Sequence, residues 1–340
     1  MRVVQLCTAK ANALGGGIKK YEDELYYHML KIIKEENLDI KLSRILRNSG
    51  AITGSMIFSW FGKYSCQNAD VIHATSQVIA PVKVIKNCKN FIVTVHDLAP
   101  MIYREEIQDF SEYIQWLLTP ETLKYVDKII AISHFTKNEI AKYTGIDDDK
   151  ITVIHQGVNH EKYHPMDRDD CLKYFKLNPE KKYILYVASN LPHKRVDLAK
   201  AVFEEIQKCR DDVMMIKAGY SERLEGNNII SMGWIDEKDM PKLYNCADVY
   251  IHTSEYEGFG LPVLEAMACG VPVVAFNRAS IPEIVGKGGY LAEDTAEFTE
   301  KVLKSLECKR LCKKARVRSM RFGWDKTARE TLRIYTSYNI

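Results

Sequence analysis

Short apolar runs alternate along the chain with longer segments in which apolar residues recur at helical spacing. The runs lie at residues 3–7, 40–43, 71–74, 91–95, 128–132, 151–154, 183–188, 213–217, 228–232, 248–252 and 271–276. Between the first two runs, Leu25, Met29 and Ile32 keep the spacing of a helix face that packs on a core. Strands that alternate with helices form parallel sheets covered on both faces. The pattern therefore predicts an α/β protein with two Rossmann-like, doubly wound domains facing each other across a cleft.

The alternation is interrupted at residues 163–180, which contain Pro165, Pro179 and several charged residues. This composition is typical of a linker. We therefore place one domain at residues 1–165 and a second at 166–324, with a last helix at 325–340.

Ligands of doubly wound sheets bind beyond the carboxyl ends of the strands. His73 and His96 each stand at such an end. For His73, a satisfied histidine of the core is the favoured interpretation. For His96, a ligand-binding role and a satisfied core histidine are both open on position alone.

A glycine-rich turn, Gly15 to Gly17, follows the first strand and precedes the first helix, which predicts a ligand-binding βα unit. The spacing is not Gly-x-Gly-x-x-Gly, so a dinucleotide fingerprint is absent. Lys19 and Lys20 stand in the first turn of that helix, where the helix dipole disfavours cations. Either an anion binds there or both side chains are solvated.

Residues 254–274 combine a glycine-containing turn with a short helix and a buried strand. Gly258 and Gly260 precede the helix, Pro262 suits its first position, and Gly270 suits the residue after its end. Backbone N–H groups at a helix start bind anions. Glu257 and Glu265 bracket the turn, and carboxylates accept hydrogen bonds from hydroxyl groups. A phosphate site flanked by two carboxylates suits a nucleotide-sugar.

A second basic turn follows the strand at 183–188. Lys194 and Arg195 stand at the start of the next helix, a position that suits a phosphate group. A solvated basic turn is the alternative interpretation.

Size and charge exclude some classes of protein. The 340 residues suit two domains of ordinary size, and 46% apolar with 27% charged residues is normal for a soluble globular protein. The net charge of +3 argues against a nucleic-acid-binding protein.

The 9 cysteines are scattered and form no Cys-x-x-Cys pair, which favours reduced thiols in a cytosolic protein. No apolar run approaches the ~18–20 residues that span a bilayer, and the start of the chain lacks the features of a signal peptide. We therefore expect a cytoplasmic location.

Basic residues are dense toward the end of the second domain. This run is either a solvated helix face or a surface for an anionic membrane, which would place the protein peripherally at the inner face of the membrane. Its members are Lys309, Arg310, Lys313, Lys314, Arg316, Arg318 and Arg321.

The sequence of residues 254–274 resembles the Glu-x7-Glu signature of family 4 of the retaining glycosyltransferases, which have the GT-B fold. Glu257 and Glu265 match the two glutamates, within Glu-Gly-Phe-Gly-Leu-Pro and Glu-Ala-Met-Ala-Cys-Gly-Val-Pro-Val-Val. Residues 189–195 resemble the family's phosphate loop, and His96-Asp97 resembles its strand that ends in His-Asp. The element at 321–328 resembles a helix that crosses back onto the first domain.

The resemblance implies roles for these residues. Lys194 would neutralise the diphosphate leaving group, Glu265 would bind the ribose, and Glu257 would bind the donor sugar near the reacting carbon. His96 would orient that sugar from the other domain. The remaining donor contacts would come from Gly16, Gly17, Ser189, Arg195, Gly233, Trp234, Gly258, Phe259, Gly260 and Leu261, and weaker acceptor-side candidates are Lys20, His73 and Asp97.

Four positions depart from the family pattern, and one of them is His193, which stands where some members have arginine. Ser189 stands where many members have arginine, so Arg195 or Lys20 would have to supply the second cationic contact. Lys20 itself replaces an arginine in the Gly-Gly-x-x-Arg stretch, and Asn159 replaces an aspartate.

The implied reaction is transfer of a hexose from a nucleotide diphosphate sugar to a hydroxyl of a glycan or lipid-linked acceptor, with retention of configuration. The sequences around His96 and Lys194 resemble members that use a GDP-mannose-like donor, and a UDP-sugar is the other option. The sequence offers no obvious carboxylate pair of a retaining hydrolase, and a metal clamp would be redundant beside Lys194. We therefore predict no metal and no cofactor, with the nucleotide-sugar as co-substrate.

Two alternatives belong to other classes. A GT-B scaffold without turnover could regulate another transferase, although His96, Lys194, Glu257 and Glu265 are all present. A nicotinamide oxidoreductase would also have Rossmann-like halves, but the Gly-x-Gly-x-x-Gly fingerprint is missing.

Overall fold

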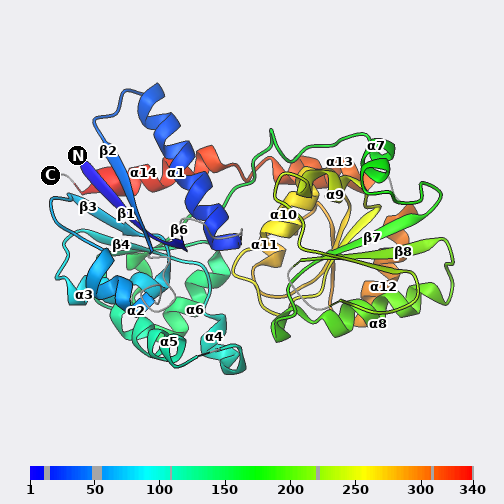
Figure 1. Cartoon of the computed structure of the whole chain (residues 1–340), viewed down its shortest axis with the longest axis horizontal. Coiled ribbons are helices and arrows are strands. Elements are labelled where there is room, and N and C mark those ends of the chain that lie inside the picture. The colour runs from blue at the N-terminus through cyan, green and yellow to red at the C-terminus, as the bar shows by residue number, and fades with distance from the viewer. Residues whose placement is uncertain (11–15, 48–55, 108, 220–222, 308–309, 339–340) are drawn as a thin grey trace. The chain divides into compact units, whose positions relative to one another are not determined.

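The computed structural model describes residues 1–10, 16–47, 56–107, 109–219, 223–307 and 310–338. Gly15, Cys308 and Lys309, which the sequence patterns include, lie outside these residues. The chain divides into two compact units (Figure 1): residues 1–157 with 324–340, and residues 158–323. The sequence-based boundary at 165/166 therefore lies within the second unit. The predicted linker at 163–180 is wrong in part, because α7 (Arg168–Tyr174) is helical and Asp167 caps it by accepting from the Asp170 N–H.

The first unit contains a parallel sheet with the strand order β2-β1-β3-β4-β5-β6. Its strands alternate with helices along the chain, as the apolar runs predict. The strands are β1 (Arg2–Lys10), β2 (Lys41–Arg47), β3 (Val71–Ala74), β4 (Phe91–Val95), β5 (Lys128–Ala131) and β6 (Ile151–Val153).

Helices cover both faces of this sheet (Figure 1). On one face α1 (Gly17–Glu35) packs against α14 (Trp324–Ser337), which is the last helix of the chain. The helices on the other face are α2 (Met56–Phe58), α3 (Pro81–Ile85), α4 (Ala99–Ile102), α5 (Phe110–Leu123) and α6 (His134–Thr144).

The second unit repeats the architecture with the strand order β12-β11-β10-β7-β8-β9. Every paired strand in both sheets is parallel. The predicted fold class, two Rossmann-like doubly wound domains, is confirmed. The strands are β7 (Lys182–Val187), β8 (Val213–Ala218), β9 (Ile229–Gly233), β10 (Val249–His252), β11 (Val273–Phe276) and β12 (Tyr290–Ala292).

Two helix layers enclose this second sheet (Figure 1). On one side α8 (Val196–Gln207) packs with α12 (Thr295–Glu307), and on the other α10 (Leu261–Ala268) packs with α13 (Arg310–Ser319). The remaining helices are α9 (Met240–Asn245) and α11 (Ile281–Val285). Each unit has its own core of buried aliphatic and aromatic side chains between sheet and helices.

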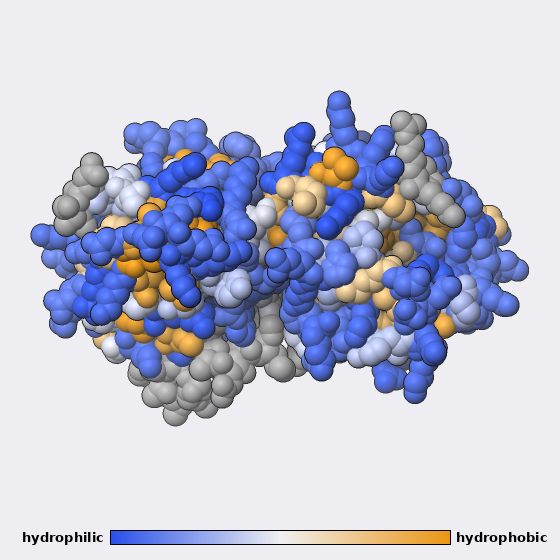
Figure 2. Space-filling view, turned by 90° about the horizontal axis from the view of Figure 1, so that it is seen from above, coloured by the Kyte–Doolittle hydropathy of each residue, from blue (hydrophilic) through white to orange (hydrophobic). Residues whose placement is uncertain are grey.

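Figure 2 shows a face on which hydrophilic residues predominate and apolar residues form small patches. No helix in the described part of the chain is long and apolar enough to cross a bilayer.

The expectation of reduced thiols is wrong for Cys66 and Cys88, which form a disulfide with their Cα atoms 5.7 Å apart. The fold brings together two cysteines whose positions in the sequence carry no pairing signal.

Candidate functional site

The sheet order of the second unit locates its site. The order in which the chain adds strands to the sheet reverses between β7 and β10. After β7 the next strand, β8, lies on one side of it, and after β10 the next strand, β11, lies on the opposite side. In open α/β sheets ligands bind at the carboxyl ends of the strands at such a switch point. The loop after β7 carries Lys194, and the loop after β10 carries Glu257. Both predicted segments therefore meet where the fold places a ligand.

Backbone and hydroxyl groups tie these two loops together. The Glu255 N–H donates to the His193 carbonyl over 2.9 Å. The Thr253 hydroxyl lies 3.0 Å from the carbonyl oxygens of both Lys194 and Arg195. These hydrogen bonds join the two loops, which the sequence patterns show only as two separate motifs.

The central contact of the site joins Lys194 to Glu257. The Lys194 Nζ lies 2.6 Å from Glu257 Oε1, and both side chains are largely buried. The same carboxylate oxygen accepts from the Ser254 hydroxyl over 3.1 Å and lies 3.3 Å from His252 Nε2. Although burial raises the pKa of Glu257, Lys194 and His252 together hold it well below its usual range. Glu257 is therefore a fixed negative charge next to a fixed positive charge.

His252 is a member of this group that the sequence analysis missed. It is buried at the carboxyl end of β10, directly before the loop that carries Glu257. Its position at a strand end is the same signal that singled out His96, so the strand-end rule could have found it. The ring stacks near Tyr250, with the ring centres 6.4 Å apart.

The turn before α10 has the backbone that its glycines predict. Gly260 has φ +103°, and a Cβ there would meet Ile281 Cδ1 at 2.8 Å. The Ser280 hydroxyl holds the turn by donating to the carbonyl oxygens of Glu257 and Phe259, at 2.8 and 3.0 Å. Gly270 follows the helix with φ +77°, as predicted. The N-terminus of α10, which is the positive end of its dipole, thus directly follows the loop that carries Glu257.

Glu265 is the fifth residue of α10. The helix begins at Leu261, so Glu265 falls outside its first turn. Its buried carboxylate accepts from the Tyr244 hydroxyl over 2.8 Å. Tyr244 is a second residue that the sequence patterns do not indicate, because it lies on α9 and meets Glu265 only in the folded protein.

Replacing Tyr244 with phenylalanine should leave the buried Glu265 carboxylate short of a hydrogen bond. We expect a loss of about 1–3 kcal/mol of unfolding free energy, together with a higher KM for the donor. Denaturant unfolding and donor titration measure the two effects. Tyr174→Phe is the matched control, because the exposed Tyr174 donates to Asp239 at the surface. Equal stability and KM for Tyr244→Phe and wild type would contradict this role.

Other predicted donor contacts lie on the same edge of the sheet. Ser189 follows β7, and Gly233 with Trp234 ends β9. Gly219 links these ends, because its N–H donates to the Gly233 carbonyl and a Cβ on it would meet Ala188 O at 2.4 Å. The Trp234 side chain is 42% exposed. Ser189, Gly233 and Trp234 therefore lie where contacts with the donor are predicted, and the contacts themselves stay predictions.

Arg195 is less available for a contact with phosphate than its position in the sequence implies. Its guanidinium pairs with Asp197, at 2.9 Å between Nη2 and Oδ2, and with Glu255. Arg195 also has a positive φ of 52° directly before α8. Two carboxylates already balance its charge, so Lys194 is the stronger candidate for a phosphate contact.

In the first unit the switch point lies between β1 and β3, and the candidates there include Gly16, Gly17 and Lys20 at the start of α1. A Cβ at Gly16 or Gly17 would meet no atom of the described residues within 4 Å. The neighbouring Lys19 pairs with Asp23 at 2.5 Å. An anion contact by Lys20 stays a prediction.

His96 lies at the end of β4 but is 4% exposed. Its Nδ1 accepts from Gln156 Nε2 over 3.2 Å, and its Nε2 donates to the Thr75 carbonyl over 2.8 Å. The Tyr21 ring meets it edge-on at 4.8 Å. Both ring nitrogens are therefore used inside this unit, and contact with a donor sugar stays a prediction.

His73 and Asp97 have local partners as well. His73 is fully buried and bonds to the hydroxyls of Tyr335 and Thr94, at 2.6 and 2.8 Å. This network ties α14 to the sheet and fits the core interpretation of His73. Asp97 Oδ1 accepts from the Ala99 N–H over 3.1 Å at the start of α4.

The buried histidines predict a pH dependence of stability. Burial lowers the pKa of His96 to about 4 and that of His73 to about 3. Both pKa values are depressed by folding, so their contribution is present above the unfolded value near ~6.5 and is lost as the pH falls. Each histidine should add a slope of up to about 1.4 kcal/mol per pH unit between about pH 6 and about pH 5.

Denaturant unfolding at several pH values measures this slope. His96→Gln should flatten it, whereas His134→Gln should not, because His134 is exposed. A wild-type slope in His96→Gln would contradict a buried, neutral imidazole.

Comparisons with known proteins identify the family of the chain. The model of the glycosyl transferases group 1 matches residues 167–320, and that of glycosyltransferase family 4 matches residues 42–162. The O-antigen chain mannosyltransferase B of Escherichia coli is 28% identical over 266 residues, which span 72% of this chain and 69% of that enzyme. The serotype-specific mannosyltransferase WbdA of Escherichia coli is 26% identical over 72% of this chain, which spans only 33% of that protein.

Solved structures show the same fold. A sucrose-phosphate synthase from Thermosynechococcus elongatus superposes with a TM-score of 0.80 at 17% identity, covering 99% of this chain and 98% of that one. Anabaena Alr3699/HepE in complex with UDP-glucose gives 0.74 at 16% identity, covering 99% and 100%. Two family models that together span most of the chain, and a fold shared with glycosyltransferases, establish that the chain belongs to the family 4, group 1 glycosyltransferases of GT-B fold.

Proposed function

We propose that this glycosyltransferase moves a hexose from a nucleoside diphosphate sugar to a hydroxyl of a glycan or lipid-linked acceptor, with retention of configuration. The observation that carries the proposal is the Lys194–Glu257 pair, held at the switch point beside the start of α10. A diphosphate needs a fixed cation and helix N–H groups, and a sugar needs a carboxylate beside it. The site combines both.

In this mechanism the Lys194 ammonium group bridges Glu257 and the diphosphate, because it has three N–H donors. It stabilises the negative charge that grows on the leaving phosphate as the glycosidic bond breaks. Glu257 stays ionised through its low pKa and accepts hydrogen bonds from the donor sugar. Glu265, fixed by Tyr244, accepts from the ribose hydroxyls. The departing phosphate takes the proton of the acceptor hydroxyl on the same face of the sugar.

The donor is proposed to be a mannose-type nucleotide-sugar. The support is the match to relatives named as mannosyltransferases, while a structure with the same fold holds UDP-glucose. A thermal-shift series with GDP, UDP, ADP and dTDP and their sugars tests this preference. The largest rise in Tm is expected with GDP-mannose, and a larger rise with UDP-glucose would assign the other donor class.

We also propose that the reaction needs no metal and no cofactor, because Lys194 supplies the positive charge that a metal would bring. Full activity in excess chelator is the expected result. Loss of activity in chelator that returns on addition of a divalent cation would contradict metal independence.

A further inference from the structure

One surface of the second unit has no place in the proposed reaction. The α13 helix exposes Lys313, Lys314 and Val317, and the turn that follows it exposes Met320 and Arg321. Val317 lies three or four residues from each of the other four, so the five positions form one stripe along the helix and the turn after it. The opposite side of α13 packs on α10 and α11. We call the exposed stripe, together with Lys287, the α13 face.

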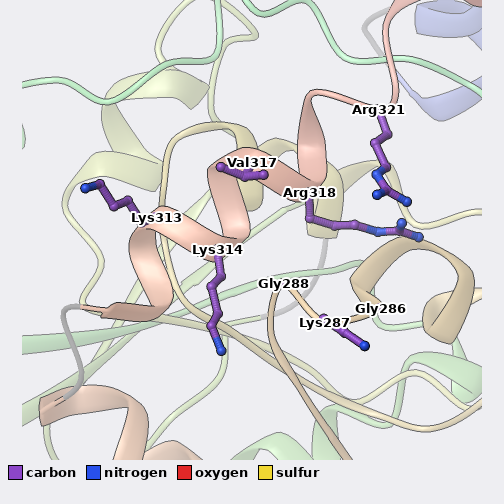
Figure 3. Close-up of a pocket in the computed structure, with 8 residues that line it drawn as sticks. All are labelled: Gly286, Lys287, Gly288, Lys313, Lys314, Val317, Arg318 and Arg321. Atoms are coloured by element: carbon purple, nitrogen blue, oxygen red, sulfur yellow. The ribbon is translucent and has the colours of Figure 1, made fainter.

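A pocket adjoins this stripe. It has a volume of ≈ 730 Å³ and lies between α13 and the Gly286–Gly288 loop that follows α11. Figure 3 shows Lys287 on the loop, with Lys314, Arg318 and Arg321 on the helix side of the same pocket. The pocket is therefore lined by cations from two separate elements.

Arg318 fixes the loop against the helix. Its Nε donates to the Ile284 carbonyl over 3.0 Å, and its Nη2 donates to the Glu283 carbonyl. A Cβ at Gly286 would meet Arg318 Nε at 3.0 Å, and one at Gly288 would meet Arg318 Cβ at 2.7 Å. Only glycines permit this close packing, which brings Lys287 to the α13 face.

The charges of the α13 face are not balanced. In the described part of the chain no ion pair joins Lys287, Lys313, Lys314 or Arg321 to a carboxylate. Basic residues elsewhere in this unit have such partners, for example Lys182 and Arg210, which share Glu307. A cluster of unpaired cations attracts an anionic partner.

We propose that the α13 face docks on the surface of a bilayer that contains anionic phospholipids. The cations would meet lipid phosphates, with one headgroup in the pocket beside Lys287. Val317 is 69% exposed and Met320 is 56% exposed between these cations. Apolar residues flanked by lysine and arginine are typical of a helix that lies in the membrane interface. A soluble polyanion would satisfy the cations and leave both apolar side chains in water.

Co-sedimentation of the full chain with vesicles tests the proposal. Vesicles of phosphatidylcholine with phosphatidylglycerol should bind the protein, pure phosphatidylcholine vesicles should not, and added salt should weaken binding. The variant Lys313→Glu/Lys314→Glu/Arg321→Glu should bind about 10²-fold more weakly, since each of the three basic residues contributes about fivefold. Val317→Asp should also weaken binding.

The matched control is Lys200→Glu/Lys208→Glu/Lys238→Glu, which makes the same charge change at exposed lysines outside the α13 face. Wild-type Tm values for both triple variants show that they fold. Equal loss of binding in the control, or equal binding to neutral vesicles, would overturn the proposal. Unchanged vesicle binding by Val317→Asp, together with displacement by inorganic phosphate, would also overturn it and identify a free-phosphate site.

Discussion

The Glu257→Gln variant should transfer sugar about 10²-fold more slowly than wild type or worse, the scale of losing one preorganised charged group. Glutamine keeps the size of the side chain but removes the negative charge that Lys194, Ser254 and His252 hold in place. The loss should appear in kcat, because the charge acts on a sugar that becomes positive in the transition state. Steady-state kinetics with saturating donor measure it.

Glu255→Gln is the matched control, since Glu255 lies two positions away in the same loop but is exposed and pairs with Arg195. It should retain most of the wild-type rate. A wild-type kcat for Glu257→Gln, or equal losses in the two variants, would refute the role of Glu257 at the reacting centre.

Replacing Lys194 with methionine should reduce kcat/KM by a similar factor of about 10² or more. The ammonium group is the cation that the structure holds at the switch point, and Arg195 is already balanced by Asp197 and Glu255. Methionine preserves the packing of the side chain stem. Lys200→Met on α8 is the control with the same chemistry, and it should leave kinetics unchanged.

The double variant Lys194→Met/Glu257→Gln separates two explanations. Residues that act as one unit lose little more together than either loses alone. We expect the double variant to be only slightly slower than the slower single variant. Fully multiplied losses would show that the pair does not work as a unit and would contradict the bridging role of Lys194.

Much of the fold could be predicted because its strands are short, fully buried apolar runs. Val71 to Ala74 and Phe91 to Val95 have the predicted bounds in the structure. The strand at Tyr290–Ala292 was missed, since it directly follows a glycine-rich loop. The sequence also does not contain the order of strands within a sheet, and that order is what locates the switch point.

The site was predictable where one stretch of chain carries it. The turn at Gly258 to Leu261 and the cap at Gly270 follow from local backbone chemistry, which is written in consecutive residues. The partners of the charged groups were not predictable. His252 and Tyr244 meet the two glutamates only through tertiary packing.

The histidines show the same limit. His96 and His73 both stand at strand ends, and the pattern cannot tell a ligand-facing ring from a buried one. The structure distinguishes them by their partners, since His73 bonds to a hydroxyl from the last helix and His96 to Gln156 and Thr75. Sequence spacing carries no information on contacts across such distances in the chain.

The account depends most on turnover of a nucleotide-sugar at the Lys194–Glu257 pair. The direct measurement is release of nucleoside diphosphate from a panel of nucleotide-sugars with a hydroxyl-bearing acceptor, combined with NMR of the product's anomeric centre. We predict release with one donor class, a retained anomeric configuration, and loss of both in Lys194→Met and Glu257→Gln. Donor binding without release by the wild-type protein, or a product of inverted configuration, would contradict the account.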